Sequence, residues 1–82
     1  MDKRIGTITV IITNRAAQAA QVNTILGEYA DAIIGRMGLP YPSRGLHIIA
    51  PIVHASADVI GALTGKLGAL EGVEVKSALT RV

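Results

Sequence analysis

The chain has 82 residues, half of them hydrophobic, with no cysteine and a net charge of +2 from 8 basic and 6 acidic residues. The lack of cysteine excludes disulfides and cysteine-based metal clusters, and so weak a charge gives no argument for nucleic-acid binding. We expect one domain over residues 1–82 with a core of Ile, Val, Leu and Ala, and so much apolar content in a small domain indicates that copies of the chain associate.

The first half of the chain begins with an expected strand from Arg4 to Thr13, which is rich in β-branched residues. The two-residue period of a strand places Ile8, Val10 and Ile12 on one face, and the other face, which includes Ile5 and Ile11, is also partly apolar. Asn14 is suited to cap a helix that runs from about Arg15 to Tyr29. The apolar side of this helix consists of Ala19, Val22, Leu26 and Tyr29, with Ile25 alongside.

The centre of the chain predicts a short strand, a loop and a long strand. Ala32 to Met37 is the short strand, and the glycines and prolines of residues 38–45 predict a loop. Leu46 to Val53 has apolar residues at both odd and even positions, so both faces of this strand would be apolar. Such a pattern is typical of a strand covered on both faces. Pro51 lacks an N–H group, so we expect a bulge or an end to regular pairing there.

A second helix is expected after Ser56, a suitable N-cap. Its apolar stripe consists of Ile60, Leu63, Leu67 and Leu70. Three glycines, at 61, 65 and 68, reduce the helix propensity of this segment. We expect a neighbouring backbone to pack closely against them, since close packing would explain glycine at these positions. Gly72 is expected to end the helix as a left-handed cap, and Val73 to Val82 is the last expected strand.

The predicted order is therefore βαββαβ. The two halves repeat weakly at about 41 residues, since Ile5 matches Leu46 and Leu26 matches Leu67. Right-handed crossovers place both helices on the same face of one antiparallel sheet. The opposite face, with its Ile, Val and Thr side chains, then needs a cover, which a second copy of the chain would provide.

The two histidines, His47 and His54, lie seven residues apart in one expected strand, so they point to opposite faces. A shared metal site would need ligands from another subunit, and surface or interface histidines are the favoured interpretation. Gly65-Lys66 lacks the spacing of a phosphate-binding loop, and Ser43 has no partner base. We therefore expect neither an enzyme nor a cofactor or metal.

Arg36, Tyr41, Arg44 and His47 surround the central loop. Guanidinium groups there are suited to hold a carboxylate or phosphate, and the alternative is a polar rim around a subunit interface. The other basic residues are scattered along the sequence. An RNA-recognition motif has the same element order, but it stacks bases on strand aromatics that this chain lacks.

The segment IIGRMGLPY with the following Arg-Gly, together with L-x-G-K-L-G-x-L-x-G-V, resembles the family of iron-only hydrogenase system regulators. These are short ACT-like proteins, similar in fold to the regulatory domain of nickel-responsive repressors. The resemblance covers nearly the whole chain. It implies an α+β, ferredoxin-like βαββαβ sandwich, homodimers or homotetramers, and a regulatory role such as transcriptional regulation. Without cysteine or a histidine cluster, the chain is not expected to sense nickel.

These observations lead to two hypotheses. The first is a ligand-responsive regulatory module that binds a small-molecule effector at the subunit junction near Arg36 to His47. The second is a structural association module that binds other protein chains and no small ligand. Lys3 and Arg4 precede an apolar run as in a signal peptide, but that run is short and carries Thr7 and Thr9. We expect a cytoplasmic protein without direct contact to nucleic acid or membrane.

Overall fold

The structure is a computed structural model that describes residues 2–13 and 15–82, without the side chains of residues 15–17. The expected cap Asn14 lies outside the described residues. The expected order of strands and helices is confirmed, with two short 3-10 helices added. The elements are β1 (Lys3–Ile12), α1 (Arg15–Glu28), η1 (Ala30–Ala32), β2 (Ile33–Tyr41), η2 (Pro42–Arg44), β3 (Leu46–Ser56), α2 (Ala57–Gly68) and β4 (Val73–Leu79).

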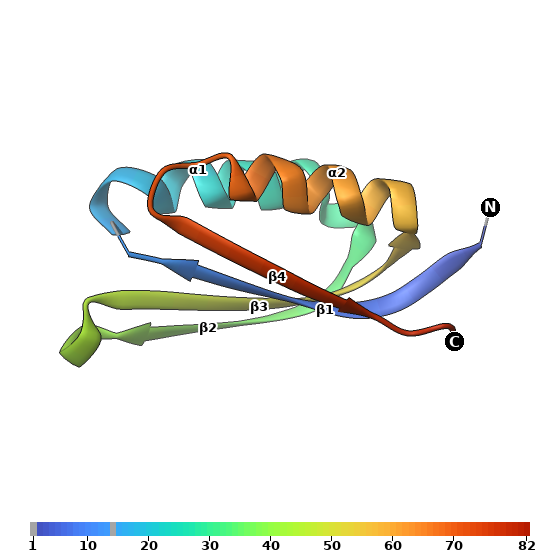
Figure 1. The fold of residues 1–82 in the computed structure, drawn as a ribbon, viewed down its shortest axis with the longest axis horizontal. Coiled ribbons are helices and arrows are strands. Elements are labelled where there is room, and N and C mark those ends of the chain that lie inside the picture. Colours follow the sequence, from blue (N-terminus) through green and yellow to red (C-terminus); the bar gives the residue numbers. More distant parts are fainter. Residues whose placement is uncertain (1, 14) are drawn as a thin grey trace.

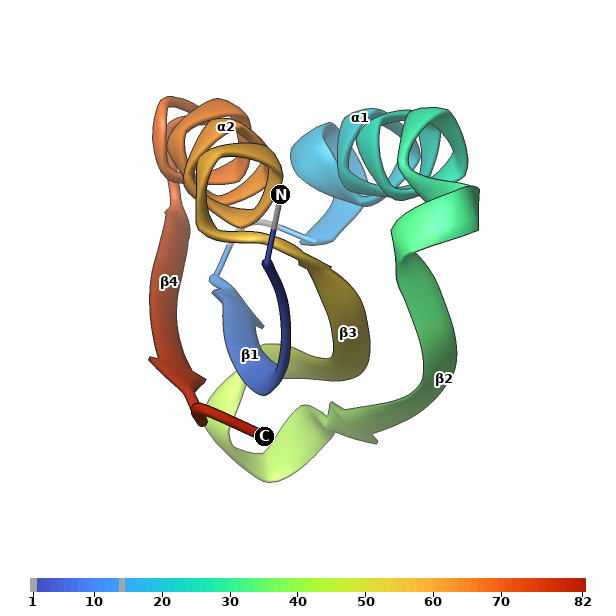
Figure 2. The same cartoon turned by 90° about the vertical axis from the view of Figure 1, so that its right-hand side faces the viewer.

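The four strands form one antiparallel sheet in the order β2-β3-β1-β4. Both helices lie on one face of this sheet, as expected, and the other face is bare (Figures 1 and 2). The sheet curls beneath the helices, so that the edge strands β4 and β2 rise toward α2 and α1 respectively (Figure 2). The molecule is elongated, with extents of 40 × 19 × 17 Å.

The core lies between the sheet and the helices, and it consists of aliphatic side chains. The expected inward residues of β1 and three of the four expected stripe residues of α2 are buried, because the two-residue and 3.6-residue periods direct them into the same layer. The fourth, Leu70, follows the end of α2 and is partly buried. The fully buried members of the core include Ile8, Val10, Ile12, Val22, Leu26, Val53, Ile60, Leu63 and Leu67.

Strand β2 is longer than the sequence predicts. The expected loop at Gly38 is wrong, because the strand continues to Tyr41 and pairs there with Leu46. Pro40 is tolerated because β2 is an edge strand, where a missing N–H need not break the ladder. The turn itself is the short η2, closed by Gly45 with a left-handed φ of 66°.

Strand β3 runs through Pro51 to Ser56, so the expected end of pairing at this proline is wrong for the strand as a whole. The register shift lies in the neighbouring strand, between Ile33 and Gly35. On the β1 side, pairs are formed at Thr7 with Ile52 and again at Val10 with Ile49 in the same register. The missing N–H therefore interrupts the ladder locally without changing which side chains face the core.

Helix α2 begins as expected, because the Ser56 side chain accepts a hydrogen bond from the backbone N–H of Val59 at 3.2 Å. It ends at Gly68, however, four residues before Gly72. Gly72 has a left-handed φ of 78°, but its carbonyl accepts bonds from Thr13 and so fixes the start of β4.

The three exposed glycines of α2, at 61, 65 and 68, do not pack against a backbone neighbour. A Cβ atom added at any of them would meet nothing within 4 Å in the described chain. The expected last strand also ends early, at Leu79.

Candidate functional site

The face of the sheet opposite the two helices, called the open face below, exposes several large apolar side chains. Cross-strand partners share a face, so the register aligns the exposed side chains of the two centre strands with those of β2. Met37 is 68% exposed, Leu39 52% and Ile52 42%. The aliphatic and aromatic side chains of this open face are Ile5, Ile11, Met37, Leu39, Tyr41, Leu46, Ile48 and Ile52.

Arg36 lies on the other side of β2, on the face that carries the helices, opposite Pro51. Its Nη2 donates to Oδ1 of Asn23 on α1 at 2.9 Å. The two residues line a cleft of about 400 Å³ between α1 and the edge strand β2, together with Leu26, Gly27, Ala30 and Ile33. Arg36 therefore holds a guanidinium group at the mouth of a partly apolar cleft.

His47 also faces the helices, since it pairs with Pro40 and with Ile12. Its Nδ1 is buried and has no hydrogen-bond partner among the described residues. The same holds for Oε1 of Gln18, near the start of α1. Buried polar atoms are normally satisfied, so the described residues leave one polar atom of His47 without its usual partner.

Tyr41 and Arg44 lie apart from this cleft. Tyr41 is 46% exposed on the open face opposite Leu46, and Arg44 is exposed in η2. The structure therefore separates the four predicted ligand residues: Arg36 and His47 face the helices, Tyr41 lies on the open face, and Arg44 lies in the turn between β2 and β3. Of the four, Arg36 alone lines the cleft.

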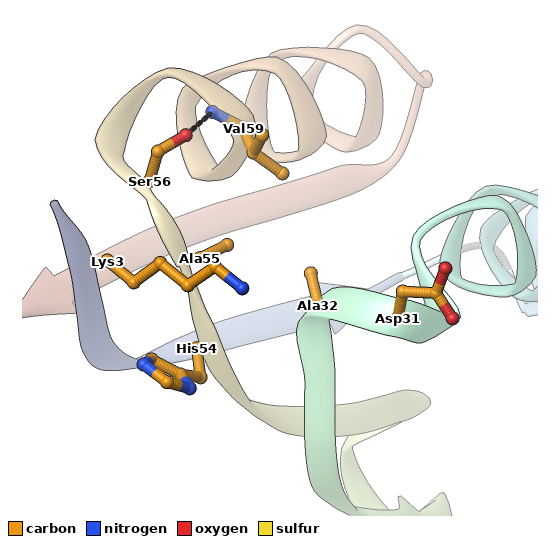
Figure 3. Close-up of a pocket in the computed structure, with 7 residues that line it drawn as sticks. All are labelled: Lys3, Asp31, Ala32, His54, Ala55, Ser56 and Val59. Carbon is orange, nitrogen blue, oxygen red and sulfur yellow. Dashed lines mark hydrogen bonds between the residues drawn. The ribbon is translucent and has the colours of Figure 1, made fainter. Parts of the chain in front are cut away.

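The two histidines point to opposite faces, as the strand period predicts, because His54 pairs with Ile5 on the open side. His54 lines a depression of about 270 Å³ with Lys3 and Asp31 at the first turn of α2. Lys3 and His54 lie on one side of it and Asp31 on the other (Figure 3). Within the described residues, no three His, Asp or Glu side chains gather as a metal site would require.

Lys66 links the two helices on their outer surface. Its Nζ lies 3.7 Å from Oε1 of Glu28 and 5.2 Å from the centre of the Tyr29 ring. Hydrogen bonding and charge at Tyr29, then the charge of Glu28, raise the pKa of Lys66 above its usual value. Both charged side chains are about half exposed, so this contact contributes little to stability.

One cluster of basic residues is not evident from the sequence. Lys3, Arg4 and Arg81 are separated by most of the chain, yet they line a single pocket of about 350 Å³ together with Asp2. The predicted topology could have indicated this cluster. If the first and last strands pair antiparallel, the start of the first strand lies beside the end of the last one.

The strand order and the two helices on one face define a ferredoxin-like α+β domain. The profile of the TM1266-like family, described as "Iron-only hydrogenase system regulator, putative", matches residues 4–77. The chain therefore belongs to this family. It is also similar to a solved structure, that of uncharacterized protein TM1266 from Thermotoga maritima, with 35% identity and a TM-score of 0.91 over 95% of this chain and 98% of that one.

Among curated proteins, none matches this chain. In the part of the chain that the structure describes, the helices are too short or too polar to cross a bilayer.

Proposed function

We propose that the protein is a regulatory module of the iron-only hydrogenase system that forms dimers or tetramers through the open face of its sheet. The observation that carries this proposal is the exposure of Met37, Leu39 and Ile52 on one continuous face. Soluble monomers rarely leave large contiguous apolar patches uncovered. A second copy offers a matching surface, because a two-fold interface places the same patch on both partners.

A small-molecule effector is the second part of the proposal. Association over the open face would place Tyr41 at the junction, while Arg36 and His47 reach the opposite side of the same hairpin. Support comes from the cleft beside Arg36. Arg44 lies in η2, apart from this cleft, so Arg36 is the residue that provides a guanidinium group for a carboxylate or phosphate there.

Such a ligand regulates only if it binds one state of the assembly more tightly than another. The β2–β3 hairpin provides a physical connection, since its two faces carry the open-face residues and the cleft residues respectively. A ligand that displaces Asn23 from Arg36 would change the position of β2 relative to α1 and thereby the shape of the open face.

Sedimentation velocity of an Ile52→Lys variant tests the association. A lysine in the centre of the open face would bury a charge in the interface, and we expect a monomer where the native chain is an oligomer. Val59→Lys is the matched control, since Val59 is a similarly exposed aliphatic residue, 37% against 42%, on the helical side. A native chain that sediments as an 8.5 kDa monomer at micromolar concentration would overturn the proposal.

Thermal-shift screening with amino acids, nucleotides and divalent metals tests the effector. A ligand at the proposed site should raise Tm, and Arg36→Gln should remove the effect. If association is intact and no compound shifts Tm, the structural association module without a small ligand is the better description.

A further inference from the structure

The end of the molecule that carries both chain termini concentrates positive charge. The start of β1 and the end of β4 lie at the same end of the long axis, opposite the end that carries η2 (Figure 1). Lys3, Arg4 and Arg81 line one pocket of about 350 Å³ there, and Asp2 is the single acidic residue among its lining side chains. This pocket is therefore separate from the hairpin residues of the proposed function.

Strand pairing fixes the position of the two arginines. The β1–β4 register pairs Gly6 with Leu79, and the backbone N–H of Thr80 donates to the carbonyl of Ile5 at 2.9 Å. The Thr80 hydroxyl donates to the same carbonyl at 2.6 Å. Arg81 follows Thr80 just beyond the end of β4, and it lines the same pocket as Arg4.

Like charges that face each other across two strands repel and destabilise the pair. In the described residues the ion pairs consist of Lys66 with Glu28 alone, so no carboxylate lies within salt-bridge distance of Arg4 or Arg81. Arg4 is half-buried, which reduces the screening of its charge by water. The chain thus holds two guanidinium groups and an ammonium group around one space without neutralising them.

We propose that Lys3, Arg4 and Arg81 form a binding site for a phosphate group, either free or carried by a phosphorylated small molecule. Guanidinium groups bind phosphate through paired hydrogen bonds, and a lysine adds a mobile point charge. A phosphate dianion balances the two arginines and has enough oxygens for all three side chains. The Asp2 carboxylate opposes binding, so the pocket carries a net charge of +2 before the ligand enters, counting the four side chains that line it.

The test is an NMR titration with inorganic phosphate at constant ionic strength. The amides of Gly6 and Thr80 report on the site, since both belong to the paired strand ends. We expect saturable shifts in the native chain and a loss of affinity of about tenfold or more in Arg81→Gln, because a hydrogen bond to a charged group is removed. A parallel titration with glycerol phosphate distinguishes the sources: tighter binding than phosphate indicates a phosphorylated molecule, and equal binding indicates that the free ion suffices.

Lys76→Gln is the matched control, since it removes one positive charge from an exposed position in β4 that does not line the pocket. Its affinity for phosphate should stay within about twofold of the native value. Without phosphate and at low salt, Arg81→Gln should leave Tm unchanged or raise it, because a repulsion is relieved. The proposal is wrong if the native chain shows no saturable shift, if Arg81→Gln binds as well as the native chain, or if Lys76→Gln loses as much affinity.

Discussion

Gly6 shows how a single residue determines how closely two strands of the sheet can approach each other. A Cβ atom at this position would lie 2.6 Å from the backbone oxygen of Ala78 and 2.6 Å from Cδ2 of Leu79. A flexible side chain could move aside, but the Ala78 carbonyl belongs to the paired strand β4 and moves only with that strand. The close approach of β4 to β1 therefore depends on glycine at this position.

Gly6→Ala should destabilise the fold by about 1–3 kcal/mol, the usual range for overpacking, which corresponds to a drop in Tm of at least about 4 °C for a domain of this size. Gly61→Ala is the matched substitution on α2, where the new Cβ meets nothing within 4 Å. It should stabilise the helix by up to about 1 kcal/mol. Thermal unfolding followed by circular dichroism measures both, and equal effects of the two substitutions would contradict this explanation.

At the scale of the element, the start of α2 rests on one side chain. Ser56 is nearly buried, at 9% exposure, and its hydroxyl satisfies the N–H of Val59. Ser56→Ala should cost about 1 kcal/mol, as loss of an N-cap does. Urea unfolding gives the free energy, with the exposed Ser77→Ala in β4 as the control. If the Ser77 variant loses as much stability as the Ser56 variant, the cap is not the cause.

The sequence predicts those elements whose own residues determine them. The alternation of β1 and the stripe of α2 follow from periodicity, and the Ser56 cap follows from local hydrogen bonding. The length of β2 does not, because Gly38 and Pro40 have the local signature of a loop and are held in a strand by pairing with β3. The expected end of pairing at Pro51 is wrong for the same reason, because neighbouring strands on both sides, β1 and β2, hold β3 in the sheet.

The candidate site was less predictable than the fold. Closeness in sequence suggested that Arg36, Tyr41, Arg44 and His47 form one group, but strand alternation sends them to different faces. In contrast, Arg4 and Arg81 are at opposite ends of the sequence and become neighbours through the β1–β4 pairing. A site made of strand residues depends on register, which a single sequence does not fix.

For the whole molecule, an interface at the open face would make the thermal stability of the protein depend on the protein concentration. If copies of the chain cover this face for one another, association adds to the stability of the native state and not to that of the unfolded chain. Unfolding is then coupled to dissociation. For a dimer, each tenfold rise in protein concentration should raise Tm by about 3–5 °C, since RT ln 10 is shared between two chains of this size.

Differential scanning calorimetry over a hundredfold range of concentration measures this dependence. Ile52→Lys should give a Tm that does not depend on concentration, and Val59→Lys should retain the native dependence. Circular dichroism of the Ile52 variant must show native secondary structure, because the argument concerns the interface and not the fold. A native chain whose Tm stays constant over the whole range, at concentrations where sedimentation detects both monomer and dimer, would show that the open face contributes nothing to stability and that Met37, Leu39 and Ile52 are exposed for another reason.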